Sequence, residues 1–336
     1  MLPRSFVYVK APLRLSLSGG GTDWVDYFQL RGGVDICTVA LDYNINLSVR
    51  RISKYYNERF RLEYYNVEHC QYVYEIKNDI IRGVLTFLHW EDPLHISVIS
   101  DLPSSSGLGS SSSFTVALLV ALLRLRGEAD PSPYELSKMA IEVELNVLNR
   151  EMGIQDCLPA AFGGFSNFRL YSKDVFVQTP LLIDHLERMV ADGHLWMIWT
   201  GGQRESGSIL GRQKEQLNSK LPLYDEMAAI SEKFSCIARQ NVSYDSFRAA
   251  LLETVQKSHA IKLRFAEGIA SPEILLMLEA LEHDGVHGLR IVGAGGGGCL
   301  LCVGDFKTMT KRDLRQRFIP LRFSSLGARV CFEELS

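Results

Sequence analysis

The chain has 336 residues, of which 46% are hydrophobic and 22% charged, which is enough to build one large core or, as we expect, two. Its formal net charge of −3 provides no broad positive field, and this argues against nucleic acid as the main partner. Seven cysteines scattered from Cys37 to Cys331 do not resemble a disulfide framework and fit a reducing cytosol. The longest apolar run, Phe114 to Leu123, is shorter than the roughly 20 residues that span a bilayer. We therefore expect a cytoplasmic protein with no signal peptide and no membrane span.

Strand-like and helix-like segments alternate along the chain. Alternating or short apolar runs predict strands at residues 5–19, 42–52, 59–66, 95–103, 162–171 and 194–202. Helical patterns occupy residues 112–125, 134–148, 206–239, 244–267 and 273–283. Asp130 or Ser132 could cap the second of these helices. The composition changes between residues 170 and 186, and we place a domain boundary there, which gives an N-terminal domain of residues 1–175 and a C-terminal domain of residues 176–336.

A serine-rich and glycine-rich stretch precedes the first predicted helix. The segment "DLPSSSGLGSSSSFTVALLVALLRLRG" runs from Asp101 to Gly127, and its apolar part predicts a helix that begins near Ser110. The first N–H groups of a helix lack intrahelical partners and lie at the positive end of its dipole. An anion close to the backbone of residues 107–109 would therefore meet ready donors. The alternative is a turn that merely caps a core helix.

Two further glycine clusters flank this region in the sequence. "LSGGGTDW" carries Gly19, Gly20 and Gly21 ahead of Thr22 and Asp23, and "LRIVGAGGGGCLLCV" carries Gly293 and Gly295–Gly298 between two strand-like runs. Three purely structural clusters are less expected than one shared phosphate pocket, because glycine runs weaken any strand or helix that holds them. The last cluster also satisfies G-x-G-x-x-G, but a strand follows it and too little chain remains for a dinucleotide-binding domain.

The serine loop carries a family resemblance. "PSSSGLGSSS" at residues 103–112 resembles the signature of the galactokinase, homoserine kinase, mevalonate kinase and phosphomevalonate kinase (GHMP) superfamily, P-x-x-x-G-L-G-S-S-A, with Ser112 in place of alanine. The other two clusters resemble the first and third motifs of that superfamily, in the same order. The resemblance implies an ATP-dependent small-molecule kinase of α+β class, with two domains and with nucleotide and sugar bound in the cleft between them.

Within the superfamily, the first motif is similar to one subgroup. "APLRLSLSGGGTDW" resembles the A-P-L-R-x-S-x-x-G-G-G-T-D form of heptose 7-phosphate kinases and of the kinase part of fucokinases, and "TGGQRESGSIL" at residues 200–210 is similar to a T-G-x-x-R-x-S segment of the same subgroup. "GIQDCLPAAFGGFSNF" at residues 153–168 also resembles it, although Cys157 and Leu158 depart from its Gln and Tyr.

The resemblance assigns the nucleotide, metal and proton-transfer residues. It implies that the ATP phosphates bind to Pro103, Ser104, Ser105, Ser106, Gly107, Leu108, Gly109, Ser110, Ser111 and Ser112. It also implies Mg²⁺ held by Glu144 with Ser110 or Ser111, a set of oxygen ligands that suits this ion, and Asp156 as the general base for the acceptor hydroxyl. The alternatives are a solvated helix face for Glu144 and a capping role for Asp156.

The substrate side is assigned in the same way. The resemblance implies that Asp23 receives sugar hydroxyls and that Gly20, Gly21, Thr22, Gly295 and Gly296 line the sugar site. Because a guanidinium fits phosphate oxygens, Arg14 and Arg204 are the candidates for the phosphate of the substrate, with Lys10 behind them. Surface or strand-edge charges are the alternative for each, and Arg290 either approaches the nucleotide or faces solvent.

These assignments favour a sugar 1-kinase that phosphorylates the anomeric hydroxyl of a heptose 7-phosphate with ATP and Mg²⁺. A fucose or galactose 1-kinase and a catalytically silent sugar sensor on the same fold stay open. We expect a small-molecule sugar phosphate as partner, neither nucleic acid nor membrane, and the sequence leaves a homodimer open.

Overall fold

A long antiparallel pair of strands, β1 (Arg4–Ser18) and β2 (Val34–Arg51), is the centre of the larger sheet. The computed structural model describes residues 4–53, 55–201, 206–308 and 312–335. The larger sheet has the order β12-β1-β2-β5-β3-β4, and β6 and β7 continue it from the other end of β2. Its further strands are β3 (Phe60–Glu63), β4 (Val67–Cys70), β5 (Leu94–Ser100), β6 (Phe165–Leu170), β7 (Phe176–Pro180) and β12 (Arg329–Leu335).

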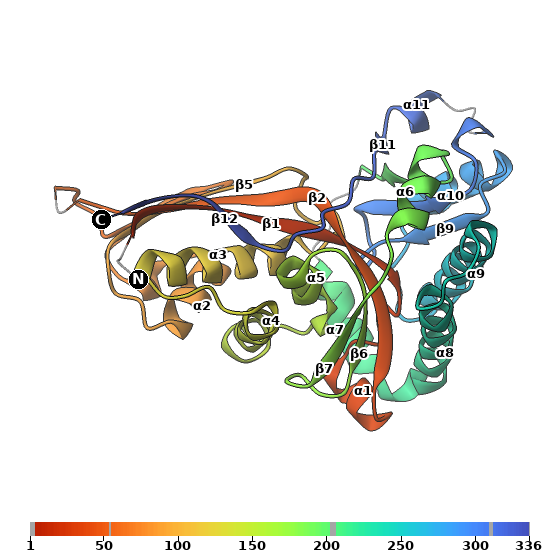
Figure 1. Ribbon diagram of the computed structural model, residues 1–336, viewed down its shortest axis with the longest axis horizontal. Coiled ribbons are helices and arrows are strands. Elements are labelled where there is room, and N and C mark those ends of the chain that lie inside the picture. Colours follow the sequence, from red (N-terminus) through yellow and green to blue (C-terminus); the bar gives the residue numbers. More distant parts are fainter. Residues whose placement is uncertain (1–3, 54, 202–205, 309–311, 336) are drawn as a thin grey trace.

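Helices cover one face of this sheet (Figure 1). They are α2 (Asp79–Phe87), α3 (Ser110–Arg126), α4 (Pro133–Glu142) and α5 (Cys157–Phe162), with the short turns η1 (Val73–Glu75), η2 (Val143–Val147) and η3 (Ile154–Asp156) beside them. Helix α1 (Val25–Leu30) lies apart from these, between β1 and β2 in the chain, and its Tyr27 contacts Tyr224 and Asp225. The central helix α3 is buried on all sides from Ser112 to Leu123 and packs on β1 and β2. A helix that is apolar all round is expected to be enclosed in this way.

The second sheet is smaller and has the order β11-β8-β10-β9. Its strands are β8 (Leu195–Trp199), β9 (Gly288–Ile291), β10 (Cys299–Val303) and β11 (Phe318–Ile319), and its helices are α6 (Asp184–Ala191), α7 (Ser206–Gln216), α8 (Leu221–Ala238), α9 (Tyr244–Lys262), α10 (Pro272–His283) and α11 (Arg312–Arg315), with the turns η4 (Asn218–Lys220) and η5 (Phe306–Thr308). Helix α9 contacts β9, and α8 packs on both α9 and β2. The helices and sheets together make the expected α+β class.

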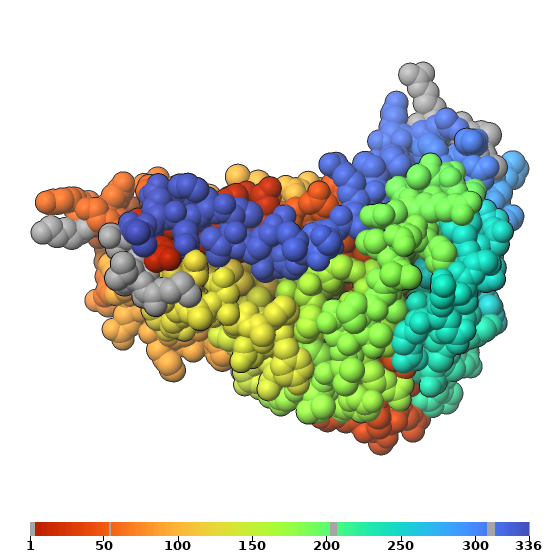
Figure 2. Space-filling view, viewed as in Figure 1, coloured from red at the N-terminus to blue at the C-terminus, as the bar shows by residue number. Residues whose placement is uncertain are grey.

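Two strands that follow the expected domain boundary between residues 175 and 176 belong to the larger sheet of the N-terminal half. Strand β7 pairs with β6 in the larger sheet, and the last strand, β12, returns to pair with β1. Figure 2 shows this last segment running back along the surface of the N-terminal half. A division into two domains remains a proposal, and in it β7 and β12 go with the first domain because backbone hydrogen bonds hold them there.

Several local predictions are confirmed and others differ. Helix α3 begins at Ser110, as expected, and Ser132 caps α4 through a reciprocal bond with Glu135. Strand β2 begins at Val34, earlier than predicted, because residues 34–41 are buried and lack the alternation of a half-exposed strand. All seven cysteines are free, five of them buried. None of the described helices is long and apolar enough to cross a bilayer.

The returning segment before β12 is fixed against the end of α5. Gly163 has φ +72° and ψ −172°, a backbone conformation that only glycine adopts readily. A Cβ at Gly163 would lie 2.3 Å from the carbonyl carbon of Leu326, and the Ala328 amide donates to the Ala160 carbonyl at 2.8 Å. Backbone against backbone leaves no room for any side chain here.

We predict that Gly163→Ala lowers the free energy of unfolding by more than the roughly 1–3 kcal/mol of backbone strain alone, because the new methyl group also meets backbone atoms. Gly32→Ala is the matched control: Gly32 has φ +70°, but a Cβ there has nothing within 4 Å. Urea unfolding measures both. Equal losses in the two variants would contradict this account of the C-terminal return.

Candidate active site

Two loops that are far apart in the sequence meet backbone to backbone. We call residues 103–112 the serine loop and residues 293–298 the glycine loop. A Cβ at Gly107 would lie 2.6 Å from the Val292 carbonyl oxygen, and one at Gly293 would lie 2.5 Å from the Gly107 Cα. The Cys299 amide donates to the Ser106 carbonyl at 3.0 Å. At least part of the glycine content therefore serves this close packing of the two loops.

The N-terminus of α3 opens into the cleft beside these loops. Its N-cap is Gly109 in the left-handed conformation (φ +71°), and no side chain caps the helix. The Ser106 hydroxyl is fully buried and has no hydrogen-bond partner within the described chain. Uncapped N–H groups at the positive end of a 17-residue helix fit an anion such as a nucleotide phosphate.

Only part of the serine loop faces the cleft. The space between the cleft walls, counted out to its mouth, is about 2660 Å³, and the serine-loop residues that line it are Pro103, Ser104, Ser105, Gly107, Gly109, Ser110 and Ser111. Leu108 and Ser112 are buried in the protein interior, as is Ser106. These three therefore shape the loop rather than line the cleft.

Tyrosines at one edge of the cleft were not expected as site residues. Tyr64 and Tyr65 both line it, and their rings meet edge to face with centroids 4.8 Å apart. Tyr65 is 89% exposed. An exposed aromatic ring beside a phosphate-sized anion site can stack on a flat ring such as a purine.

Asp156 lies where this cleft joins a second, smaller pocket, in a bidentate pair with Arg14 of β1. Arg14 is 3% exposed, and its Nε and Nη2 atoms donate to the Asp156 carboxylate at 2.8 and 2.7 Å. The Nη1 atom donates to the Gly107 carbonyl. The guanidinium thus fixes the carboxylate beside the serine loop. All three of its nitrogen atoms already donate hydrogen bonds within the protein.

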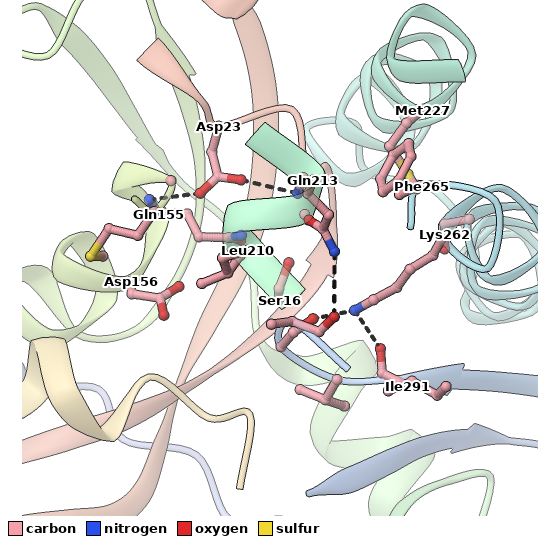
Figure 3. Close-up of a pocket in the computed structure, with 18 of the residues that line it drawn as sticks. Ser16, Asp23, Gln155, Asp156, Leu210, Gln213, Met227, Lys262, Phe265 and Ile291 are labelled. Atoms are coloured by element: carbon pink, nitrogen blue, oxygen red, sulfur yellow. Dashed lines mark hydrogen bonds between the residues drawn. The ribbon is translucent and has the colours of Figure 1, made fainter. Parts of the chain in front are cut away.

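Asp23 lies in the smaller pocket, which also includes Gly20 and Gly21 (Figure 3). It accepts hydrogen bonds from the Gly21 amide at 3.0 Å and the Gln155 amide at 3.1 Å. Burial and the charge of Asp156 raise the pKa of Asp23 to about 6, although the amide bonds oppose the shift. A carboxylate held in this way keeps lone pairs for hydroxyl donors.

Glu144 is fully buried inside a cluster of polar groups. Thr115 donates to its Oε1 and Arg150 to its Oε2, each at 2.7 Å. Arg150 also donates to the Ser111 hydroxyl and to Asp79. Burial raises the pKa of Glu144, and the Arg150 charge opposes that shift. The solvated-helix alternative for Glu144 is wrong. Arg150 was missed because nothing in the run "NVLNREMG" marks it.

The Arg150 contacts test whether this cluster fits a metal ion. One cationic nitrogen, Nη1, contacts both the Glu144 carboxylate and the Ser111 hydroxyl. A cation in that place would therefore have two oxygen ligands, the kind that Mg²⁺ prefers. Among the described residues no group of three His, Cys, Asp or Glu side chains is arranged around a metal position. The residues fit Mg²⁺ once Arg150 moves away.

The other expected substrate residues are dispersed. Thr22 is buried and its hydroxyl donates to the Gly19 carbonyl at 2.8 Å, so it holds the turn. Gly295 lines the larger cleft, and the Gly296 amide donates to Ile269 at 2.8 Å. Lys10 lies in β1 between β2 and β12 and lines neither pocket. Arg204 lies outside the described residues.

Comparison with known proteins agrees with this geometry. The family model described as "GHMP kinases N terminal domain" matches residues 71–164, and "GHMP kinases C terminal" matches residues 245–313. The chain belongs to the GHMP kinase family. Members of this family transfer a phosphoryl group from ATP, so this GHMP kinase is an ATP-dependent phosphotransferase with an alcohol group as acceptor.

Individual relatives are also similar over much of the chain. A D-glycero-alpha-D-manno-heptose 7-phosphate kinase of Campylobacter jejuni is 27% identical over 300 residues, which is 87% of each protein. A mevalonate kinase of Pyrococcus furiosus is 27% identical over 215 residues, or 64% of this chain and 60% of that one. The crystal structure of a D-glycero-D-manno-heptose 1-phosphate kinase from Bacteriodes thetaiotaomicron has the same fold, with a TM-score of 0.74 over 97% of this chain and 99% of that one at 20% identity.

We predict that Arg150→Met makes this GHMP kinase respond to metal. Without the guanidinium, the buried Glu144 carboxylate lacks a cation, and Mg²⁺ would supply one. Millimolar Mg²⁺ should therefore raise the thermal unfolding midpoint of the variant by more than that of the wild type. The double variant Arg150→Met/Glu144→Gln is the control and should lose the response. An equal response in wild type and Arg150→Met would contradict competition between arginine and metal.

We predict a pH-dependent difference in stability between the wild type and Asp23→Asn. The native pKa of Asp23 is about 6 against an ordinary 3.8. Above about pH 6 its carboxylate is therefore charged in the folded protein, where that charge is less stable than in the unfolded chain. That cost is relieved as the pH falls, and it is worth about 3 kcal/mol at most. The stability advantage of the variant over the wild type should therefore shrink as the pH falls from 7 toward 4, whatever constant offset the lost amide bond adds. Urea unfolding across this range measures it, and a constant difference would contradict the assignment.

Proposed function

We propose that the chain is a sugar-phosphate kinase that transfers the γ-phosphoryl group of ATP to the anomeric hydroxyl of D-glycero-D-manno-heptose 7-phosphate and gives heptose 1,7-bisphosphate. The observation that carries the proposal is the Arg14–Asp156 pair, with donor distances of 2.7 and 2.8 Å, at the junction of the two cavities. An acceptor hydroxyl next to Asp156 would face a phosphate held at the serine loop.

The larger cleft supports binding of ATP. The uncapped N-terminus of α3 offers amide donors to the phosphates, and the glycine loop lines the same cleft beside the serine loop. Tyr64 and Tyr65 offer an aromatic edge for the purine. Positioned donors of this kind account for most of the catalysis in phosphoryl transfer, which demands little covalent chemistry from the protein.

The smaller pocket supports binding of the sugar. Asp23 has its carboxylate fixed by two amides and can accept hydrogen bonds from two hydroxyls of the sugar. Asp156 then orients the anomeric hydroxyl or takes its proton as the new bond to phosphorus forms. Each Asp156 oxygen receives one bond from Arg14 and keeps a lone pair for this step.

Glu144 and Ser111 would hold Mg²⁺, with Ser110 as the alternative hydroxyl. Bound Mg²⁺ would neutralise part of the charge on the nucleotide phosphates. In this proposal Arg150 releases both oxygens and stays with Asp79, to which its Nη2 atom already donates at 2.7 Å.

The heptose ester is proposed over free fucose or galactose because the Campylobacter jejuni heptose 7-phosphate kinase is similar to the chain over 87% of both proteins. The pocket around Asp23 also contains cationic side chains, Lys262 and Arg290. Free fucose and free galactose offer these cations no charge to bind.

A panel of sugars tests the proposal. We predict that ADP release with ATP and Mg²⁺ is fastest with D-glycero-D-manno-heptose 7-phosphate and slow with free heptose, fucose and galactose. Asp156→Asn should lower kcat by about 10²–10⁴-fold, because the acceptor loses its base, with little change in the KM for ATP. Rapid turnover of free fucose or galactose without turnover of the heptose ester would overturn the substrate assignment.

The matched control for that variant is Asp225→Asn. Asp225 forms a similar bidentate pair with Arg31, at 2.8 Å for both contacts, on the protein surface. Its loss should leave kcat within about threefold of wild type, a change worth less than about 1 kcal/mol. An equal loss in both variants would show that breaking an arginine–aspartate pair, rather than removing the base, causes the effect.

A further inference from the structure

Two cationic side chains in the wall of the smaller pocket form no ion pair with any acidic side chain that the structure describes. The Lys262 ammonium donates to the Ile291 carbonyl at 2.9 Å and to the Gly293 carbonyl. The Arg290 guanidinium donates to the Leu17 carbonyl at 2.8 Å, to the Ser258 hydroxyl at 3.1 Å and to the Ser16 carbonyl. Within the part of the chain that the structure describes, neither forms an ion pair. All of these acceptors are neutral.

Burial of these charges is costly without an anion. Arg290 is 6% exposed, and removal from water, with the nearby charge of Arg14, lowers its pKa to about 10. Removal from water and the charges of Arg290 and Arg14 lower the pKa of Lys262 to about 7, although the carboxylates of Asp23 and Asp156 oppose that shift. An unpaired buried charge costs several kcal/mol, and a bound anion would offset that cost. The side of the pocket formed by Lys262 and Arg290 is therefore suited to bind an anion.

Unpartnered polar atoms converge on the same space. The Ser16 hydroxyl and the Gln155 side-chain oxygen are more than nine-tenths buried, line the pocket and have no hydrogen-bond partner in the described chain. A Cβ at Gly20 would lie 3.3 Å from the Ser16 hydroxyl, so the glycine keeps this corner open. Polar groups buried without partners are rare in native proteins and here point to a ligand.

The cations lie across the pocket from the acceptor end. Figure 3 shows Lys262 reaching in from one side while Asp156 lies on the other, with Ser16 between them. The space between the walls, counted out to the mouth, is about 780 Å³. A sugar whose phosphate and reacting hydroxyl are at opposite ends of its carbon chain matches this separation of charge.

We propose that Lys262 and Arg290, with the Ser16 hydroxyl, bind the phosphate monoester that the sugar substrate already carries, an inference that rests on the proposed function. Arg14 was expected to do this, but its guanidinium is engaged by Asp156 and the Gly107 carbonyl. The alternative expectation that Arg290 faces solvent is wrong, since the side chain is buried behind β1.

The kinetic test compares a phosphorylated with an unphosphorylated sugar. In Lys262→Met, kcat/KM for D-glycero-D-manno-heptose 7-phosphate should fall about 100-fold, the size of one charge-assisted hydrogen bond, while kcat/KM for free D-glycero-D-manno-heptose changes little. Lys262→Arg should restore part of the loss. An equal fall with both sugars, with a raised KM for ATP, would overturn the proposal and place Lys262 at the transferred phosphoryl group instead.

Lys220→Met is the matched control. Lys220 likewise donates to two backbone carbonyls, those of Arg264 and Phe265 at 2.8 and 2.9 Å, but it does not line the pocket. Its loss removes the same kind of contact and should leave the ratio of the two kcat/KM values unchanged. A ratio altered to the same extent as in Lys262→Met would overturn the assignment.

A binding measurement keeps this inference separate from the proposed function. With a nonhydrolysable ATP analogue filling the larger cleft, inorganic phosphate should bind the wild type saturably in a calorimetric or ³¹P NMR titration. Lys262→Met should bind at least tenfold more weakly and Lys220→Met normally. This result would stand even if no sugar in the panel were phosphorylated. No saturable binding to the wild type, or equal binding to Lys262→Met, would overturn the proposal.

Discussion

The backbone of Gly107 lies against that of Gly293 with no space for a side chain between them. This contact joins the serine loop, which leads out of the larger sheet, to the glycine loop, which connects β9 to β10 in the smaller one. It fixes where the N-terminus of α3 opens into the larger cleft. It also brings β1, with Arg14, beside the end of β9, with Arg290. The two cavities share a wall because these loops touch.

Charge is divided across the resulting site. Asp23 and Asp156 lie on the side formed by the first glycine turn and η3, and Lys262 and Arg290 lie on the side formed by α9 and β9. Each carboxylate is fixed by donors, the first by two amides and the second by a guanidinium. Among the described residues, Lys262 and Arg290 donate hydrogen bonds only to neutral acceptors. In the function proposed above, the carboxylate side would bind the hydroxyls of the sugar and the cationic side would bind its phosphate.

Arginine has different roles at three places in this site. Arg14 orients a carboxylate, Arg150 bridges Glu144 and Ser111, and Arg290 is buried among carbonyls. In each place the planar fork contacts more than one acceptor, which an ammonium group does less rigidly. The Arg150 guanidinium supplies the positive charge beside the buried Glu144 carboxylate.

Residues that are close in the sequence were predictable. The serine loop, the start of α3 at Ser110 and the capping of α4 by Ser132 follow from hydrogen bonds within a few positions, so the local pattern contains them. The family resemblance of three ordered motifs implied the fold class, and the same resemblance implied Asp23, Glu144 and Asp156 as site residues.

What each candidate contacts was decided by tertiary structure. Arg14 and Asp156 are 142 positions apart, and Arg290 and Ser16 are 274 apart, so no local pattern reports either contact. The pairing of strands and the meeting of loops also decide that Ser112 is buried and that Arg150 contacts both Ser111 and Glu144. They likewise place Lys262 and Arg290 where no described acidic side chain pairs with them. The sequence alone determined which groups are present and which backbone segments could bind phosphate, because those properties are local. The partner of each charge was set only by the fold, because Coulomb attraction and burial depend on distance in space.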